Sequence, residues 1–441
     1  MPLAVRCKYR IRFISFKFVF NFVSNERQAA DSNSDDESLN DNTSVYSMRS
    51  DNNGSVDDES EDAAFSATEK YEEKLVQAIE NATEKSAQTR VTALQAMCDT
   101  MMHRFLPDFI DDRKVTIMDI IEKSIRRGKG NEQALAAHLA PLLIMQLGGD
   151  EEIAKSIGIL LLATAQNKAN TFDARAKCVS ALALLNFLGG DDIGDVIALM
   201  QQLEAIFSGS YLKGDKTPST VAADAGALHA AALSAWGLLL TLIPSGDFCS
   251  LMSTNSLAPS ISNLIGMLQS PHLEVRMATG EVIALVLECG RGHEDDFLES
   301  YLPELIDATK LLATDSKKFR AKRDRKTQRA TFRDVLRYLE DDTQPEITIR
   351  FGTESLELDT WAIHHQYTAL CAIMGPGMTS HLRENDFLRD ILQLGSKLIQ
   401  ANGMAGFKQK KLERRLINAA AFKARTLSRS KNRDKRSAVF A

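Results

Sequence analysis

The sequence predicts an all-α protein built as an armadillo/HEAT-like helical repeat solenoid, with a short β hairpin and a basic C-terminal helix. Three observations support this fold class. Aromatic residues make up only 7% of the 441 residues, while Leu and Ala are abundant, and this composition favours helices over a β-sandwich. Apolar residues recur with helical period through the middle of the chain. Related helices also return at intervals of roughly 40–47 residues, the period of armadillo and HEAT repeats.

Five related helices mark the repeats. They are predicted over residues 89–97, 132–143, 174–185, 228–240 and 275–287. If Arg90, Gln133, Arg175, His229 and Arg276 are equivalent points, the spacings are 43, 42, 54 and 47 residues. The one long spacing contains the polar insert SGSYLKGDKTPST at 208–220, which we interpret as a loop on one side of the stack.

The first 28 residues have two interpretations. Bases between Arg6 and Arg12 precede an apolar run from Phe13 to Val23, a pattern that resembles a signal peptide. However, Lys17 interrupts the run, no small-residue cleavage site follows, and the run is too short to span a bilayer. We favour an unstructured or alternatively translated leader over secretion.

An acidic, Ser-rich arm follows the leader. Residues 31–62 hold 11 acids and one base, Arg49. Because residues 29–66 contain so little apolar surface, we expect this stretch to be disordered. Its Ser residues are either phosphoacceptors or parts of a solvating linker. Helical period begins at about residue 68, where Leu75, Ile79 and Ala82 share one face.

Glycine and acidic residues separate the helices. The breaks Gly148-Gly149-Asp150 and Gly189-Gly190-Asp191 predict a left-handed Gly at the end of one helix and an Asp N-cap on the next. We interpret the acid pairs Glu151-Glu152 and Asp191-Asp192 as complements to helix dipoles rather than as metal ligands.

Beyond Leu312 the chain becomes basic. Residues 317–337 hold ten bases against Asp324 and Asp334. The apolar positions in this segment predict a helix docked on the solenoid, and its charged outer face is either merely solvated or a nucleic-acid contact. Those apolar positions are Phe319, Phe332, Val335, Leu336 and Leu339. The candidate contacts of this secondary basic segment are Lys317, Lys318, Arg320, Lys322, Arg323, Arg325, Lys326 and Arg329.

The next segment is the one part of the sequence whose pattern predicts β-strands. EITIRFGTESLELDTW at 346–361 alternates apolar and polar residues around Gly352, which indicates a short hairpin. Helical patterning resumes at Trp361–Met374 and again at Phe387–Gln400, and Gly375-Pro376-Gly377 between them is a turn.

The basic tail is the strongest functional signal. From Phe407 a basic helix is predicted, with a narrow apolar stripe and cations on its other faces. These cations repel one another until phosphates relieve the repulsion, so the tail is a candidate for binding RNA; a nuclear localisation tract is an equally good interpretation. The candidate nucleic-acid contacts are Lys408, Lys410, Lys411, Arg414, Arg415, Lys423, Arg425, Arg429, Lys431, Arg433, Lys435 and Arg436.

Catalytic and metal-binding motifs are absent from the sequence. There is no phosphate-binding loop, no nucleophile elbow and no C-x-x-C pair, and the six cysteines are scattered. His364-His365 sits on a predicted helix, where adjacent residues point to different faces, so we interpret the pair as surface or core polarity. Trp236 and Trp361 are expected in the core. We therefore expect no enzymatic activity, no cofactor and no metal.

Four segments of this chain resemble the interferon-related developmental regulator family. They are SYLKGDKT at 210–217, KKFRAKRDRKTQRATFRDVLR at 317–337, FGTESLELDTW at 351–361 and LERRLINAAAFKARTLSRSKNRDKR at 412–436. The acidic stretch near 34–51 is also similar, so the resemblance extends over residues 31–437. The N-terminus departs from it, because the family begins with a polar, basic leader whereas Phe13–Val23 is apolar.

The resemblance implies a regulator of gene expression in growth and differentiation. Two modes of action are associated with the family. The first is transcriptional co-regulation through co-repressor and histone deacetylase partners, and it is our leading hypothesis, since a solenoid offers a long concave surface for protein partners. The second is binding to inactive ribosomes, with a C-terminal helix in an RNA-lined channel. We expect both nuclear and cytoplasmic localisation, and no membrane partner.

Four parts of the chain are expected. They are a disordered leader and arm over 1–66, the repeat domain over 67–314, a family-specific module over 315–405 and the basic helix or tail over 406–441.

Overall fold

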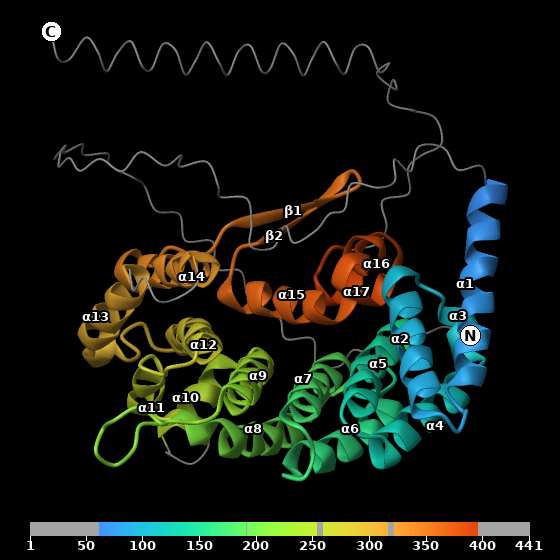
Figure 1. The fold of residues 1–441 in the computed structure, drawn as a ribbon. Helices are drawn as coiled ribbons and strands as arrows, with labels where there is room; N and C mark the ends of the chain where they lie inside the picture. The colour runs from blue at the N-terminus through green and yellow to red at the C-terminus, as the bar shows by residue number, and fades with distance from the viewer. Residues whose placement is uncertain (1–60, 191, 254–258, 316–321, 396–441) are drawn as a thin grey trace, which may run out of the picture. The chain divides into compact units, whose positions relative to one another are not determined.

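The fold is described from a computed structural model of the chain. The structure describes residues 61–190, 192–253, 259–315 and 322–395 (Figure 1), and these residues fall within one compact unit. The predicted leader, the arm up to residue 60 and the basic tail with all twelve of its candidate contacts lie outside the described residues. Lys317, Lys318, Phe319 and Arg320 also lie outside them.

The described helices stack in two layers, which confirms the predicted all-α solenoid (Figure 1). Successive inner helices pack on one another, and each inner helix after the first also packs on the outer helix or helices that precede it in the chain. The inner layer consists of α2 (Ala87–His103), α5 (Asn131–Leu147), α7 (Phe172–Gly189), α9 (Ala223–Leu240), α12 (Leu273–Arg291) and α14 (Lys322–Asp341). The outer layer consists of α4 (Lys114–Arg127), α6 (Glu151–Gln166), α8 (Ile193–Phe207), α10 (Ser245–Ser253), α11 (Ile261–Met267) and α13 (Leu302–Ala313).

Short elements complete the stack. α1 (Glu61–Asn81) packs on α2, and α3 (Pro107–Asp111) packs on α5. Two 3₁₀ turns, η1 (Ser208–Ser210) and η2 (Glu299–Tyr301), follow α8 and precede α13. The polar insert after η1 is a loop, as predicted. In the described part of the chain, α9 is the one helix long and apolar enough to cross a membrane, yet 67% of it is buried inside the solenoid.

The first helix begins earlier than the sequence indicated. α1 starts at Glu61 rather than near residue 68, so the expectation of disorder through residue 66 is wrong for its last six residues. In the sequence, acidic residues at 61 and 62 favour the start of a helix, and Ala63 and Ala64 are strong helix formers. These local preferences extend the helix into a stretch that has little apolar surface.

The predicted break after α5 is confirmed. Gly148 caps the helix with a left-handed backbone, φ 72°. Asp150 then accepts the Ile153 N–H at 3.1 Å and starts α6. Glu151 and Glu152 lie in the first turn of α6, where the helix dipole favours acids.

The prediction is wrong for the glycines after α7. Gly189 is the last helical residue and Gly190 has a φ of −85°, which is not left-handed. A side chain at Gly190 would lie 2.5 Å from the Asn186 carbonyl oxygen, so a close contact requires glycine there. Asp192 is the N-cap of α8 and accepts the Gly194 N–H at 2.7 Å.

The five positions taken as equivalent in the sequence share one structural role. Near the start of each inner helix, the side chain bonds back to the chain segment that precedes that helix, and in four of the five cases a backbone carbonyl accepts the bond. The pairs are Arg90 with Glu84 and Lys85, Gln133 with Ile125, Arg175 with Ala165, His229 with the Ser210 hydroxyl, and Arg276 with Ser270. Gln328 of α14 donates to the Leu312 carbonyl at 3.2 Å in the same way. The repeat register read from sequence spacing therefore corresponds to a repeated hydrogen bond.

The predicted hairpin follows α14. β1 (Ile347–Phe351) pairs antiparallel with β2 (Glu354–Leu358), and Gly352 takes a positive φ of 58° in the turn between them. The buried Arg389 side chain donates to both carboxylate oxygens of Glu354, at 3.2 and 2.7 Å. This bond fastens the hairpin to the last helix of the chain's described part.

Beyond the hairpin the chain returns along the inner layer. We call residues 361–391 the C-terminal strap; it comprises α15 (Trp361–Met374), η3 (Gly375–Gly377), α16 (Met378–Glu384) and α17 (Asp386–Ile391). α15 contacts α12, α9, α5 and α2, and α16 contacts α2. In Figure 1 the strap lies on the side of the inner helices that faces away from the outer layer. The face expected to be open for protein partners is therefore covered by the chain itself.

The helical prediction for the strap is only partly correct. α15 has the predicted bounds, and Gly375–Gly377 forms the predicted turn. The helix predicted over 387–400 ends at Ile391, and Gln393 with a φ of 56° leaves helical geometry. α16 was not predicted, because its seven residues are too few to show a period.

Candidate nucleic-acid interface

α14 contains the described part of the secondary basic segment. Its apolar side chains Phe332, Val335 and Leu339 are buried, and the helix packs on α12 and α13, which confirms the predicted docked helix. Four bases are exposed on the opposite side: Arg323, Lys326, Arg333 and Arg337. With 3.6 residues per turn and 1.5 Å per residue, these four lie within about 80° of the circumference and about 21 Å of the length of the helix. We call this set the α14 stripe.

Two of the four stripe residues have no acidic partner among the described residues. Arg323 and Arg333 form no ion pair with any described residue. Arg337 lies 3.6 Å from Asp334, and both side chains are more than half exposed, so this pair neutralises little charge. Asp324 is on a different side of the helix, about 100° from Arg323.

Buried contacts hold the helix that carries the stripe. Arg276 of α12, which is 2% exposed, donates to Gln328 Oε1 at 2.7 Å. Nearer the C-terminus of α14, Lys310 of α13 lies 2.7 Å from Glu340, but this ion pair is exposed and adds little. The helix that carries the stripe is therefore held on the solenoid by its buried side chains.

The structure changes which residues of the secondary basic segment are candidate nucleic-acid contacts. Arg329 is half-buried beside the stripe, and its Nε donates to the Arg325 carbonyl at 3.3 Å. Arg325 is half-buried on the side of α14 that carries Phe332, about 160° from Arg323, so it does not belong to the stripe. Arg333 and Arg337 belong to the stripe, although the candidate set ended at Arg329. Arg333 follows Arg329 by four residues and Arg337 follows Arg333 by four, and this spacing was the signal that would have included them.

The histidine pair is part of the core, in agreement with the sequence interpretation. His365 is 7% exposed, and its Nε2 lies 2.9 Å from the Ser234 carbonyl oxygen of α9. Its Nδ1 lies 3.9 Å from the Glu281 carboxylate. Burial lowers the pKa of His364 to about 4 and also lowers the pKa of His365. Both rings are therefore neutral at neutral pH, and the His365 ring joins α15 to α9. Trp236 and Trp361 are also in the core, 0% and 4% exposed.

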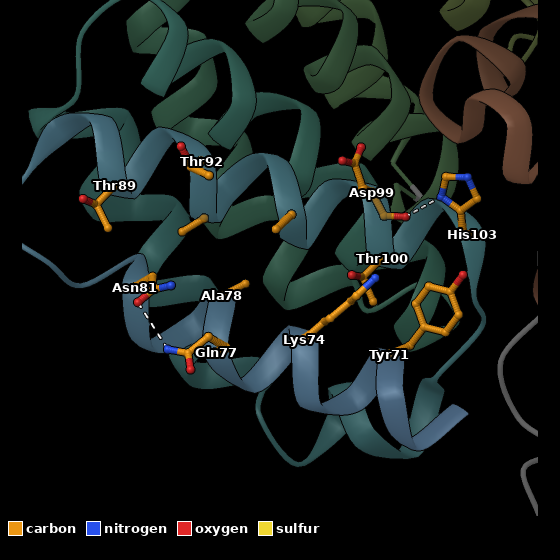
Figure 2. A pocket seen from close by; sticks show the side chains of 12 residues that line it. Tyr71, Lys74, Gln77, Ala78, Asn81, Thr89, Thr92, Asp99, Thr100 and His103 are labelled. Atoms are coloured by element: carbon orange, nitrogen blue, oxygen red, sulfur yellow. Dashed lines mark hydrogen bonds between the residues drawn. The ribbon is translucent and has the colours of Figure 1, made fainter. Parts of the chain in front are cut away.

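A groove of about 530 Å³ lies between α1 and α2 (Figure 2). Ala78, Ala93 and Ala96 are among the small side chains that line it, with Lys74 and Asp99 among the charged ones. His103 also lines it, but its Nδ1 lies 2.7 Å from the Asp99 backbone oxygen rather than from the carboxylate. The two residues therefore do not form an acid–base pair.

The remaining reactive groups are structural. Cys98, Cys178 and Cys249 are buried free thiols and Cys289 and Cys371 are half-buried; burial raises the pKa of each. Thiols of this kind behave as small apolar groups. Within the described ranges, no three His, Cys, Asp or Glu side chains lie close enough to hold a metal ion.

Comparison with known proteins identifies the family. Residues 42–340 match the model of the interferon-related developmental regulator family, and residues 385–437 match the model of the interferon-related protein conserved region. The chain is 39% identical over 379 residues to interferon-related developmental regulator 2 of Mus musculus, covering 85% of each protein. It is 37% identical over 375 residues to interferon-related developmental regulator 1 of Homo sapiens, covering 84% of this chain and 82% of that one. The chain therefore belongs to the interferon-related developmental regulator family, whose members are named as regulators rather than enzymes and whose name implies a role in growth and differentiation.

Proposed function

We propose that this protein regulates gene expression by binding ribosomal RNA and repressing translation. The observation that carries the proposal is the α14 stripe, four exposed bases on one side of a firmly docked helix. When exposed cations such as these contact phosphates, the counterions condensed on the RNA are released, and this release favours binding. The twelve bases between Lys408 and Arg436 add to the same charge, and we propose that they enter an RNA-lined channel.

The covered inner layer supports an RNA partner over a protein partner. A solenoid usually binds proteins on its inner face, but here the C-terminal strap packs on that face. The most exposed large apolar side chains, Val115, Ile159 and Leu311, lie on three different outer helices. Scattered exposed apolar residues do not mark a protein interface.

The first test is sedimentation of a cell lysate through a sucrose gradient at low and at high salt. The full chain is compared with a truncation after Gly406. We expect the full chain to travel with ribosomes at low salt and to leave them at high salt, because phosphate contacts weaken steeply as salt rises. We expect the truncation to lose most of this association. If both forms stay at the top of the gradient at low salt, the ribosome proposal fails.

Transcriptional co-regulation through co-repressor and histone deacetylase partners is the competing proposal. It is supported by the resemblance to the family and by the import-like tracts in the basic tail. Affinity purification before and after nuclease treatment separates the two. Co-repressor subunits that remain after RNA digestion would support co-regulation, whereas loss of all partners on digestion supports RNA binding.

A further inference from the structure

We propose that the α14 stripe binds the phosphate backbone of double-helical RNA, without reading its sequence. This inference rests on the proposed function and specifies the RNA that this surface fits. It also assigns RNA binding to the folded repeat unit, separately from the basic tail.

The first argument is the rigidity of the stripe. The helix is docked through Phe332, Val335 and Leu339, which are all buried, and Arg276 holds its middle through Gln328. The backbone positions of the four cations are therefore fixed within a strip about 21 Å long on one side of the helix. A duplex presents its phosphates in fixed rows, so two rigid partners lose little conformational freedom on binding. A single strand would have to be ordered along the helix.

The second argument is the lack of an aromatic platform. Single-stranded nucleic acids are bound largely by stacking their bases on exposed aromatic side chains. The aromatic side chains of α14, Phe332 and Tyr338, are 0% and 1% exposed and face the core. Without stacking groups on the stripe, the backbone is the part of an RNA that it can hold.

The third argument is the kind of base. Three of the four stripe residues are Arg, and the guanidinium group can donate two parallel hydrogen bonds to a phosphate. Arg can also read guanine from the major groove of DNA, but the major groove of an RNA duplex is too deep and narrow for side chains to read. Recognition of double-stranded RNA relies mainly on shape and on backbone contacts, which suits a surface of this composition.

The test uses the full chain and two triple variants. The stripe variant is Arg323→Gln, Lys326→Gln and Arg333→Gln. The matched control is Lys123→Gln, Arg126→Gln and Arg127→Gln on α4, where three exposed bases are lost from another helix. All six positions are exposed and Gln is a good helix former, so both variants should fold. Affinities for a blunt RNA duplex and for an unpaired RNA strand of equal length are measured by fluorescence anisotropy against salt.

We expect the stripe variant to lose duplex affinity in a salt-dependent way. The logarithm of the affinity falls with the logarithm of the salt concentration by about 0.9 per phosphate contact, so removal of three contacts makes this slope shallower by about 2.7. Between about 50 and 200 mM salt, the unsubstituted chain should therefore lose about 40-fold more affinity than the stripe variant. The control should keep the slope of the unsubstituted chain. The affinity for the unpaired strand should change little in either variant, because the basic tail is expected to bind that strand.

Three outcomes would overturn the inference. The first is an unchanged duplex slope in the stripe variant, and the second is an equal loss in the α4 control. The third is a stripe variant that keeps RNA binding but loses binding to phosphatidylserine vesicles, which would make the stripe a membrane surface. In each case a full chain that still binds RNA leaves the proposed function resting on the basic tail, because the stripe no longer supports it. If the full chain binds neither the RNA duplex nor the unpaired strand, the proposed function itself is wrong.

Discussion

Glu288 joins the solenoid to the strap through a single carboxylate. Its two oxygens accept the Trp361 and Ala362 N–H groups at 2.9 and 2.8 Å, which are free donors at the start of α15. Burial raises the pKa of Glu288, although these two donors counteract part of the shift. An acid of α12 thus completes the N-terminus of a helix that begins 73 residues later in the chain.

Replacing this carboxylate should weaken the whole fold. In Glu288→Gln the amide can accept only one of the two bonds, so one buried N–H loses its partner, at a cost of about 1–3 kcal/mol. We expect the free energy of unfolding, measured in urea, to fall by this amount. The exposed Glu299→Gln is the control and should stay within about 0.5 kcal/mol. Equal effects of the two substitutions would show that the Glu288 bonds contribute nothing specific.

The strap helices carry buried histidines that make the fold sensitive to acid. Burial lowers the pKa of His364 and of His381 to about 4 each, and it also lowers the pKa of His365. His381 Nε2 lies 3.0 Å from the Met101 carbonyl oxygen, so the neutral ring donates to α2. Because an unfolded histidine titrates near 6.5, the unfolded chain takes up protons first as pH falls.

We therefore expect stability to be constant above about pH 6.5 and to fall as pH decreases from there to about 4. Glu281 acts in the opposite direction between about pH 7 and 4.5, since burial raises its pKa to about 7 and the folded chain then binds the extra proton. Burial also lowers the pKa of His138 and His229 and raises the pKa of Glu288 and Asp334. Five histidines with lowered pKa values outweigh three acids with raised ones, so the net effect is a loss. The measurement is the urea midpoint against pH for the unsubstituted chain and for His381→Asn, whose curve should be flatter. A midpoint that does not change across this range contradicts the prediction.

The inner helices show what their sequences could and could not predict. Their existence and register followed from helical period and from spacing, since each position is dictated locally. The covered inner face was missed, although its signal was present: α9 buries Leu228, Leu233, Trp236 and Leu239 among twelve residues around its circumference. A helix that is apolar all round is covered all round, so a covering element could have been expected.

The α14 stripe and the C-terminal strap also differ in how far the sequence could predict them. The α14 stripe could be predicted, because three- and four-residue spacing places bases on one face of any helix. The position of the strap could not, because it depends on contacts such as that between His381 and Met101, which are 280 residues apart. Pairings of that kind have no local pattern.

At the scale of the whole molecule, the strap changes how a repeat array should unfold. Repeats in an ordinary solenoid contact only their neighbours, so the two ends can open independently. Here α15 packs on α12 near one end while α16 packs on α2 near the other. Asn385 donates to the Met145 carbonyl at 3.1 Å, across 240 residues of sequence. The strap therefore links distant repeats, and the described unit should unfold as one.

Breaking the far attachment of the strap should divide this single transition. A side chain at Gly377 would lie 1.6 Å from the Met102 carbonyl oxygen, so Gly377→Val must push η3 away from α2. Hydrogen exchange read by mass spectrometry across increasing urea then reports α2 and α9 separately. In the unsubstituted chain and in Gly214→Val, whose site is open, both helices should lose protection at the same urea concentration. In Gly377→Val, α2 should lose protection first, because only its neighbours still hold it. Separate transitions already present in the unsubstituted chain would mean that the strap rests on the repeats without coupling them.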